Sequence, residues 1–582
     1  MSVQWATRCL PGFSILALLV LLLSASDAIP EPWRDPARDK LDRPELNLAQ
    51  KIFILYSIFV HLNTVLFTGR LSWALSSAFA QTSKVLKQRD HSPSGASEQS
   101  GPLDDPFSTA LDKGFRRASV AEVAELVEDV THAIIIPNYN EDIGTLEETL
   151  DVLARHPRAR SQYEIYLAME EKEASAAEKA EKLVCSFEKS FALIQPTFHP
   201  AGLPSEIAGK SSNVAFAARH IAQIHQAELE AGTCDVIITV MDADTNLWQD
   251  YFTEIRRLHY AHPAISNRTL YSCPIIFDRN SNDSPILVRC ADLLWSFAGL
   301  STMYPGSTIS IPTSVYSLPL TLASTVGGWD SDPTSIGEDM HMMLKCYFET
   351  NGDLVSQVVY APASQCNVSS EITRPGLRRA LDTCVARYRQ ALRHMWGALD
   401  TGFAARNTLR SVRSKDWRCL LLRPRHLALM HLLWEAHFLP CHFTILLLFS
   451  MIYEQTTLYR AAPLHPAMAF TFTLTAYLRA LSFVWMNICI TLYNRWYKLC
   501  LDRRRQDAQP NRFSLKTGLA EGSGFSDRTP WYRLTFLLER IAFPIAGTVF
   551  GAIPTIQAVF MHFRTDRLVY RVSKKPAFAV AV

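Results

Sequence analysis

The chain has 582 residues, of which 48% are hydrophobic and 20% are charged, and its formal net charge is +2 at pH 7. This composition allows a large folded domain, and the balanced charge shows no basic excess that would indicate a nucleic-acid partner. The 12 cysteines include no CxxC pair, so neither a zinc site nor a small disulfide scaffold is indicated.

The N-terminal part of the chain holds two hydrophobic runs and one polar segment. The first run follows Arg8 and precedes small residues, the layout of a signal peptide or a signal anchor over residues 1–28. The second run, residues 51–69, is about long enough to form a transmembrane helix. Residues 81–120 are rich in Ser, Gly, Asp and Pro, a composition that predicts a disordered linker.

From residue 131 to residue 400, short apolar strands alternate with helical periodicity, which predicts a mostly parallel α/β sheet. The predicted strands include "HAIIIPNYNE", "YEIYLAME" and "DVIITVMDADT". Thr145 and Glu148 have the spacing of a capping box at the start of the first predicted helix. Ligands of such sheets bind outside the carboxyl ends of the strands. The residues expected to meet there are Tyr139, Asn140, Glu141, Asp242 and Asp244.

Asp242 and Asp244 follow a buried strand directly, and two like charges so close together favour a bound cation. Such a DxD pair can hold Mg²⁺ or Mn²⁺, which takes its other ligands from substrate phosphates and water. An acidic pair in an ordinary surface loop is the structural alternative. The sequence around the pair decides between the two interpretations.

Two later helices carry further candidate residues. Glu338 and Asp339 begin a predicted helix, where they either favour the helix dipole or remove a proton from an acceptor hydroxyl. In "DTCVARYRQALRHMWGALD", Arg389, Gln390 and Arg393 lie near one another on a helix. They form either an exposed polar face or a guanidinium site for a diphosphate.

Three hydrophobic runs near the C-terminus, residues 427–453, 467–493 and 541–561, predict further membrane segments. Pro and Gly residues in the last run indicate either a transmembrane helix or a re-entrant segment. Residues 494–533 are rich in Lys and Arg and are expected to form a cytosolic loop. The positive-inside rule then predicts a multi-pass membrane protein with a cytosolic catalytic domain, in the plasma membrane or in the Golgi or endoplasmic reticulum.

The order of these motifs resembles the membrane-bound family 2 glycosyltransferases, the type of the cellulose, chitin and hyaluronan synthases. The matching stretches are "IIPNYNE", "GKSSN" with Lys210 and Asn213, "DAD", "GED" and "QALRHMW". Gly337 stands where the family has Thr before the acidic pair. His394 occupies the place of the family's Trp, and Trp396 comes two residues later.

The resemblance implies a GT-A fold, a Rossmann-like mixed and mostly parallel sheet, beside transmembrane helices. It implies an inverting, metal-dependent hexosyl transfer from a nucleotide-sugar, expected to be a UDP-sugar, to a glycan or another hydroxyl acceptor. It also implies a role in polysaccharide, cell-wall or cell-surface glycan synthesis at a lipid bilayer. Asp339, with Glu338, is the expected catalytic site, and Asp242 and Asp244 are the expected ligands of Mg²⁺ or Mn²⁺. The expected donor-binding residues are Pro137, Tyr139, Asn140, Glu141, Glu170 (or Glu171), Lys210, Asn213, Asp242, Gln390, Arg393 and Trp396.

Two other functions are compatible with parts of the sequence. "MDADT" also fits the catalytic loop of haloacid dehalogenase-like phosphatases, in which the first Asp is the nucleophile, although that loop normally follows the first strand. Arg479 lies inside a hydrophobic run, where it could line a transport pathway or pair with Glu435. A non-enzymatic membrane transport protein is therefore the third possibility.

Overall fold

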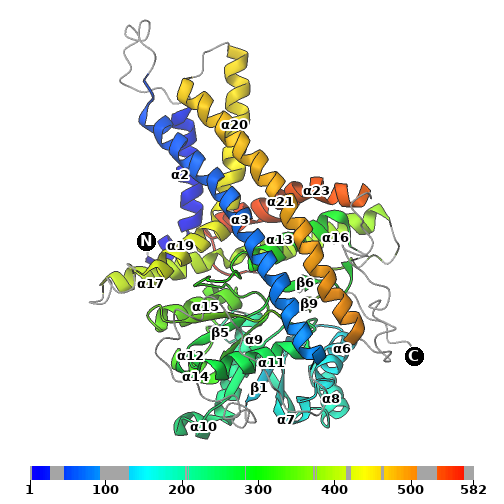
Figure 1. Cartoon of the computed structure of the whole chain (residues 1–582). Helices are drawn as coiled ribbons and strands as arrows, with labels where there is room; N and C mark the ends of the chain where they lie inside the picture. Colours follow the sequence, from blue (N-terminus) through cyan, green and yellow to red (C-terminus); the bar gives the residue numbers. More distant parts are fainter. Residues whose placement is uncertain are drawn as a thin grey trace.

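The computed structural model combines a sheet-containing domain with a bundle of long helices that stands on it (Figure 1). The described residues are 3–26, 45–91, 130–203, 206–207, 209–281, 284–370, 372, 374, 376–413, 421, 423–460, 465–507 and 534–568.

The main sheet has seven strands in the order β3-β2-β1-β4-β7-β5-β8. Strands β3, β2, β1 and β4 run parallel to one another, as do β5 and β8, whereas β7 is antiparallel to both β4 and β5. A second sheet pairs β6 with β9. The predicted mixed, mostly parallel sheet is confirmed. The strand bounds are β1 Thr131–Asn138, β2 Tyr163–Glu170, β3 Leu193–His199, β4 Val236–Val240, β5 Thr269–Ser272, β6 Ile275–Phe277, β7 Tyr316–Pro319, β8 Val355–Val358 and β9 Ala363–Gln365.

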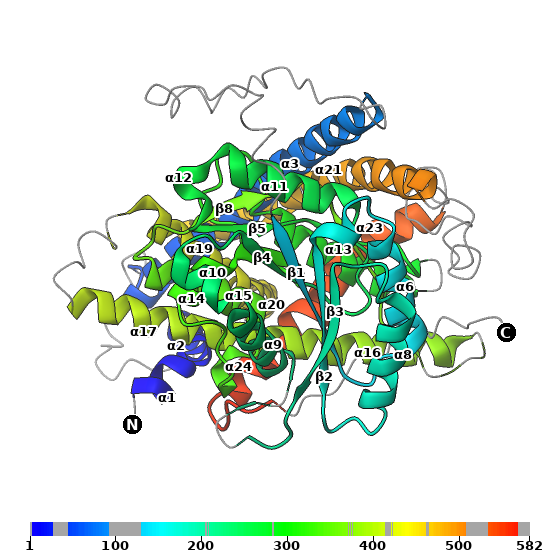
Figure 2. The same ribbon diagram turned by 90° about the horizontal axis from the view of Figure 1, so that it is seen from below.

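Helices cover both faces of the main sheet, as Figure 2 shows from below. One face buries an apolar cluster with α9 and α15, and the other face buries a second cluster with α6, α8 and α11. Strands buried on both faces explain the continuous apolar runs of β1 and β4. The helix bounds are α6 Ile143–Ala154, α7 Ala159–Gln162, α8 Ala176–Phe187, α9 Lys210–Ile224, α10 Gln226–Ala231, α11 Gln249–Ala261, α12 Pro263–Ser266, α13 Ile286–Leu300, α14 Leu320–Thr325, α15 Glu338–Glu349, α16 Leu377–Met395 and α17 Leu399–Arg413.

The start of α6 differs from the predicted capping box. Asp142 is the N-cap, and its carboxylate accepts a hydrogen bond from the Gly144 backbone N–H. Glu148 instead forms a buried ion pair with Arg279. Glu148 is thereby held by a residue far along the chain, which local spacing does not reveal.

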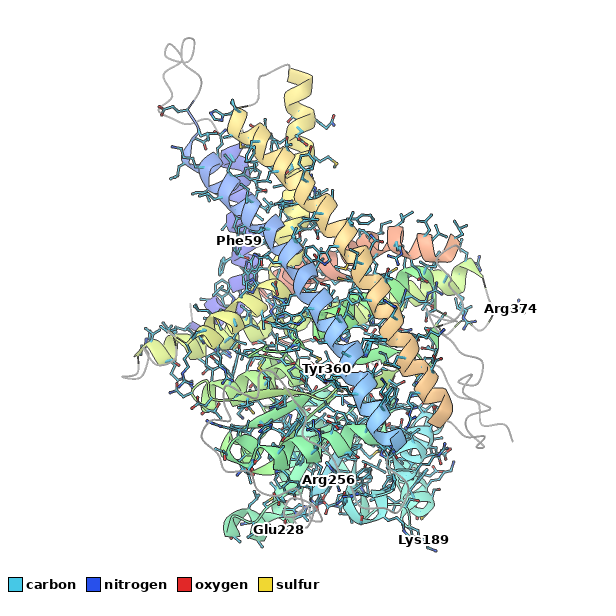
Figure 3. All side chains as sticks on the ribbon, viewed as in Figure 1. Phe59, Lys189, Glu228, Arg256, Tyr360 and Arg374 are labelled. Carbon is cyan, nitrogen blue, oxygen red and sulfur yellow. The ribbon has the colours of Figure 1, made fainter. Side chains whose placement is uncertain are left out.

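The bundle contains the helices that are long and apolar enough to cross a membrane. Within the described part of the chain, three helices meet this condition, or up to four if the bent pair α19 and α20 forms one span. Large apolar side chains such as Phe59 are exposed on the upper half of α3, whereas Lys189 and Glu228 lie at the opposite end of the molecule (Figure 3). The bounds are α3 Leu48–His91, α19 Pro424–His437, α20 Leu439–Arg460, α21 Pro466–Asp507, α23 Leu534–Gly547 and α24 Ile553–Met561.

Two of these helices are longer than the sequence predicts. Helix α3 continues from the predicted span, residues 51–69, to His91, so the first residues of the predicted linker are helical. Helix α21 likewise continues into residues 494–507 of the predicted basic loop. The two helices pack side by side and onto the domain, and this packing extends them beyond their apolar runs. The remainders of both predicted segments lie outside the described residues, up to residue 129 and up to residue 533.

The N-terminal helices α1, Val3–Arg8, and α2, Leu10–Ala25, are integrated into the structure. Helix α1 packs on α17, and α2 packs on α3, α20 and α24. Arg8 forms an ion pair with Asp566 at 3.0 Å. Gly12 lies so close to Phe563 that a Cβ atom would be 2.4 Å from that ring. Both expectations for residues 1–28, a signal peptide and a signal anchor, remain predictions.

The last apolar segment is interrupted rather than straight. Helix α23 contains Pro544, and a π-helical turn, Thr548–Ala552, separates it from α24. Figure 1 shows α23 lying crosswise to the long helices α3 and α21, partway along their length. Both predicted alternatives, a transmembrane helix and a re-entrant segment, stay open for residues 541–561.

Candidate active site

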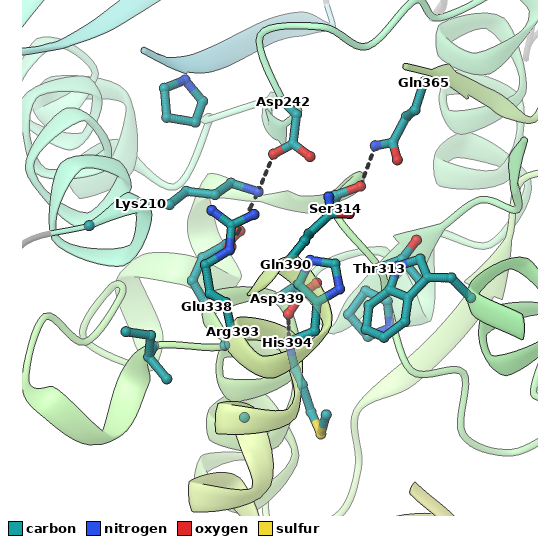
Figure 4. Close-up of a pocket in the computed structure, with 18 of the residues that line it drawn as sticks. Lys210, Asp242, Thr313, Ser314, Glu338, Asp339, Gln365, Gln390, Arg393 and His394 are labelled. Atoms are coloured by element: carbon teal, nitrogen blue, oxygen red, sulfur yellow. Dashed lines mark hydrogen bonds and ion pairs between the residues drawn. The ribbon is translucent and has the colours of Figure 1, made fainter. Parts of the chain in front are cut away.

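A pocket of about 340 Å³ lies at the carboxyl ends of β1, β2 and β4 (Figure 4). Strands β1 and β4 are parallel neighbours, so their ends meet at the same edge of the sheet. Helices α9, α15 and α16 supply the other walls. The predicted site residues that line the pocket are Pro137, Tyr139, Glu141, Glu170, Lys210, Asn213, Asp242, Asp244, Glu338, Asp339, Gln390 and Arg393.

Lys210, at the start of α9, joins the DxD pair to the acidic start of α15. Its ammonium lies 2.8 Å from Asp242 Oδ1 and 3.3 Å from Glu338 Oε2. Burial acts to lower the pKa of Lys210, but the carboxylates of Asp242 and Glu338 outweigh burial and raise it. Lys210 is therefore a permanent cation at the centre of the pocket.

Asp244 is more enclosed than Asp242, with 4% of its surface exposed. Its Oδ2 accepts a hydrogen bond of 3.1 Å from the Cys366 backbone N–H, just after β9. Its own carbonyl accepts a hydrogen bond from the buried Arg279, which is ion-paired with Glu148. The DxD loop is thus fixed by groups from three separate segments of the chain.

The acidic pair on α15 divides into two different environments. Glu338 is buried and accepts a hydrogen bond of 3.2 Å from the Tyr316 hydroxyl. Asp339 is partly buried and accepts a hydrogen bond of 2.8 Å from the adjacent Met340 N–H. Burial raises the pKa of both carboxyls, to about 7 for Glu338, against the opposing effect of Lys210. The raised pKa makes the Asp339 carboxylate a stronger base than an ordinary Asp.

A buried charge cluster holds α15 against α17. His341 lies between Asp400 and Asp330, at 2.6 Å and 3.1 Å from their carboxylate oxygens. Burial acts to lower the pKa of His341, but the two carboxylates outweigh it and raise the pKa to about 9. A Cβ atom on Gly337 would lie 3.2 Å from Asp400 Oδ2. A side chain at position 337 would therefore require Asp400 to shift by a few tenths of an ångström.

The stability of the protein is expected to fall as the pH rises through about 9. The folded-state pKa of His341 lies above the ordinary value of 6.5, so its stabilisation is complete below pH 6.5 and is lost on deprotonation. His341→Gln should lower the free energy of unfolding at pH 7 by about 3–5 kcal/mol, since it leaves Asp400 buried without a charged partner. Thermal unfolding of the detergent-purified protein between pH 7 and pH 10 measures both effects. His220→Gln, on α9, is the control, and a wild-type curve without a step near pH 9 would contradict the assignment.

Helix α16 places Gln390, Arg393 and His394 on the pocket. Residues at these spacings share one face of a helix. Arg387 supports them from the buried side, where it donates a hydrogen bond to Gln390 and pairs with Asp292 at 3.3 Å.

The prediction that Trp396 binds the donor is wrong. Trp396 is fully buried and does not line the pocket. Its indole N–H donates a hydrogen bond of 3.3 Å to the Asp566 carbonyl, and its ring contacts His562 edge-on at 4.8 Å. Trp396 comes directly after the last residue of α16 and faces away from the pocket that Arg393 lines. It therefore packs against the C-terminal segment.

Asn140 also lies outside the pocket lining. It has a left-handed backbone conformation, with φ of 59°, and its N–H donates a hydrogen bond of 2.8 Å to Glu173. Asn140 therefore shapes the turn after β1, and Glu141 and Tyr139 face the pocket. Of the two candidates at the end of β2, Glu170 lines the pocket and Glu171 does not.

The sequence did not reveal several pocket residues. Lys172 lies over the Tyr139 ring at 4.2 Å, beside Glu170 at 3.4 Å. Trp295 comes from α13, and its ring lies against that of His394. Lys172 and Trp295 belong to none of the sequence motifs, and only long-range packing brings them to the pocket. The others include Phe277, Thr313, Ser314 and Gln365.

The pocket suits a cation that is shared with a substrate. No group of three or more His, Cys, Asp or Glu residues in the described parts of the chain could hold a metal ion alone. However, Glu141, Asp242, Asp244, Glu338 and Asp339 all line one pocket. Burial, together with the nearby charges of Asp244 and Asp242, raises the pKa of Glu141 to about 7. Asp242 and Asp244 fit an ion that takes its remaining ligands from phosphate oxygens.

Comparison with known proteins gives one family match. Residues 237–498 match the family described as "Glycosyl transferase family group 2". The matched segment begins within β4 and ends within α21. A search of curated proteins gave no match.

Similar solved structures include the mannosyltransferase PcManGT from Pyrobaculum calidifontis in complex with GDP-Man and Mn²⁺. The two sequences are 13% identical, the match covers 77% of this chain and 100% of the mannosyltransferase chain, and the TM-score is 0.37. GalNAc-T7 with UDP, GalNAc and Mn²⁺ is 11% identical, covers 51% of this chain and 54% of that chain, and has a TM-score of 0.25. Both similarities are too distant to assign an activity to this chain.

Proposed function

We propose that the chain, whose residues 237–498 match the group 2 glycosyltransferase family, is a membrane-integral, inverting glycosyltransferase. It moves a sugar from a nucleotide-sugar, most simply a UDP-sugar, to a hydroxyl acceptor. One observation carries the proposal. Asp339 and the pair of Asp242 and Asp244 line a single pocket and are joined there by Lys210 and Glu338.

The donor end of the pocket lies at β1 and β2. In this proposal Glu170 and Tyr139, which line that end, would meet the nucleoside, and Lys210 and Arg393 are the cations that would meet the diphosphate. Asp242 and Asp244 would hold Mg²⁺ or Mn²⁺, which when bound supplies positive charge to the departing diphosphate. Glu338 holds Lys210 in position rather than touching the acceptor.

Asp339 is the proposed base. Its carboxylate accepts the proton of the acceptor hydroxyl while the hydroxyl oxygen forms a bond to the anomeric carbon. The bond between that carbon and the phosphate oxygen breaks, and the nucleoside diphosphate leaves with the electron pair. Attack opposite the leaving group inverts the anomeric configuration.

The helices long and apolar enough to span a membrane support membrane association. We further propose that the pocket faces the cytosol, in the plasma membrane or in the Golgi or endoplasmic reticulum, and that the product belongs to a polysaccharide or a cell-surface glycan. The basic residues between the C-terminal hydrophobic segments support this orientation.

The fold disfavours the two alternative functions. The "DADT" loop follows β4, the fourth strand along the chain, whereas a phosphatase of the dehalogenase type has it after the first strand. Arg479 lies 3.2 Å from His61, and Glu435 pairs with Arg70 instead. Arg479 therefore has a hydrogen-bond partner on the neighbouring helix α3 instead of the partner expected from the sequence.

A panel of nucleotide-sugars offered to the purified protein in membranes tests the proposal. Release of a nucleoside diphosphate from one donor, together with incorporation of its labelled sugar into an acceptor, is the expected result. Labelling of Asp242 as an aspartyl-phosphate, with no sugar transfer from any donor, would favour the phosphatase instead.

A further inference from the structure

The pocket has a second end with a different chemistry, which we call the apolar arm. Beyond Asp339, the pocket is lined by small and apolar side chains and by aromatic rings. The residues of the apolar arm are Trp295, Ala298, Ile311, Pro312, Met395 and Ala436. Charged side chains line the donor end of the pocket, and the polar side chains of Thr313, Ser314 and His437, next to Pro312 and Ala436 in the chain, line the pocket beside the apolar arm.

An aromatic pair marks the start of the apolar arm. The rings of Trp295, on α13, and His394, on α16, have centroids 4.3 Å apart and planes inclined by 32°. Both residues line the pocket, and Figure 4 shows His394 beside Asp339. The pair presents ring surface next to the proposed base, and sugar rings and other heads with C–H faces pack well on such surfaces.

The far end of the apolar arm reaches the helix bundle. Ala436 and His437 line the pocket and are the last residues of α19. The next helix, α20, begins at Leu439, and the two axes bend by 55° at the break between them. This bent pair is one of the candidate membrane spans. The pocket is therefore continuous from the proposed base to a break in a membrane helix.

An apolar passage selects its occupant by desolvation. A hydrophilic glycan chain in the apolar arm would lose water from its hydroxyl groups and regain hydrogen bonds only where polar side chains such as Thr313 and Ser314 face it, and each hydroxyl left without a partner costs free energy. An alkyl or prenyl chain carries no such cost and gains from leaving water. A molecule with a hydroxyl-bearing head and an apolar tail matches both the charged and the uncharged part of the pocket.

We propose that the acceptor is a membrane amphiphile. Its head packs on the pair of Trp295 and His394, with its hydroxyl toward Asp339, and its tail follows the apolar arm to the break between α19 and α20. This inference rests on the proposed glycosyl transfer and adds the acceptor class to it. The acceptor oxygen forms the bond to the anomeric carbon, its proton goes to Asp339, and the nucleoside diphosphate leaves.

The lipid dependence of the product tests the inference. The purified full-length protein is reconstituted either into vesicles of synthetic phosphatidylcholine or into vesicles of the total lipid extract of the host cells, each with the labelled donor. A water-soluble polysaccharide extract of the same cells is added in parallel. Label that enters the chloroform-soluble fraction only with the total lipid extract is the expected result. Label in an ethanol-precipitable polymer, or donor hydrolysis without any labelled lipid, would overturn the inference. Absence of nucleotide release under all conditions would overturn the proposed function itself.

A variant series tests the aromatic pair. Trp295→Ala should raise the KM for the lipid acceptor about tenfold and change the KM for the donor much less, whereas Trp295→Phe should restore most of the acceptor affinity. Trp73→Ala, which removes a half-exposed ring on α3 outside the pocket, is the matched control. Thermal unfolding of each variant identifies loss of fold. Equal changes in the two KM values, in variants that remain folded, would contradict an acceptor role for Trp295.

Discussion

Replacing Asp339 by Asn is expected to lower the rate of sugar transfer by about 10²- to 10⁴-fold, the usual contribution of a general base. Asn keeps the size of the side chain and can still accept the hydrogen bond from the Met340 N–H, so the start of α15 should stay intact. It cannot accept a proton from the acceptor hydroxyl. The measurement is transfer of labelled sugar at saturating donor, together with donor affinity measured by competition.

Glu349→Gln provides the matched control for this variant. Glu349 is the last residue of the same helix and is exposed to solvent. Its replacement removes one carboxylate from α15 without touching the pocket, so activity should stay close to that of the wild type. If Asp339→Asn retained wild-type turnover, another group would have to be the base.

Asp244→Asn is expected to lower transfer by about 10²- to 10³-fold, corresponding to the loss of about 3–4 kcal/mol of stabilisation at the departing diphosphate. The amide oxygen can still accept the hydrogen bond from the Cys366 N–H, so the DxD loop should remain in place. What changes is the charge that holds the divalent ion. Measuring transfer over a range of Mn²⁺ concentrations should therefore show a higher metal requirement in the variant.

Asp235→Asn is the control on the same strand. Asp235 lies just before β4, at the end opposite to the DxD loop, and its side chain is 46% exposed. Its variant should keep the wild-type metal response. An Asp244→Asn enzyme with an unchanged metal response and rate would remove Asp244 from the metal site.

Much of the sheet follows from local sequence patterns. The stretch "YEIYLAME" coincides with β2, and "HAIIIPNYNE" contains most of β1. Apolar residues in these runs are buried on both sides, so continuous hydrophobicity is a reliable signal. The sequence was sufficient to predict that Lys210, Asp242 and Asp339 lie at one edge of the sheet, because parallel strands end together at that edge.

The aromatic wall of the pocket could not be predicted in the same way. The motif comparison suggested Trp396 as the aromatic residue, whereas helical geometry puts Gln390, Arg393 and His394 on one face. Local sequence patterns do not single out Trp295, because α13 meets α16 only through tertiary packing. The aromatic surface beside Asp339 therefore comes from two distant segments.

The ends of the long helices were also beyond composition alone. A hydrophobic run shows which residues can lie within a membrane, but it does not show where the helix ends. Helices α3 and α21 continue because they pack on each other and on the domain. Leu86 is buried well past the first predicted span, Leu501 is buried past the third, and Arg504 pairs with Asp278 at 2.6 Å inside the domain. These contacts stabilise helical turns that their polar composition does not indicate.

Dependence of transfer on a divalent ion tests the central claim most directly. Nucleoside diphosphate release and sugar transfer are measured with the purified wild-type protein in membranes, before and after removal of metal ions with EDTA, and again after addition of Mn²⁺ or Mg²⁺. Both activities should disappear with the chelator and return with the added ion. Unchanged transfer after complete chelation would contradict the assignment of Asp242 and Asp244 as the residues that hold the ion against the donor.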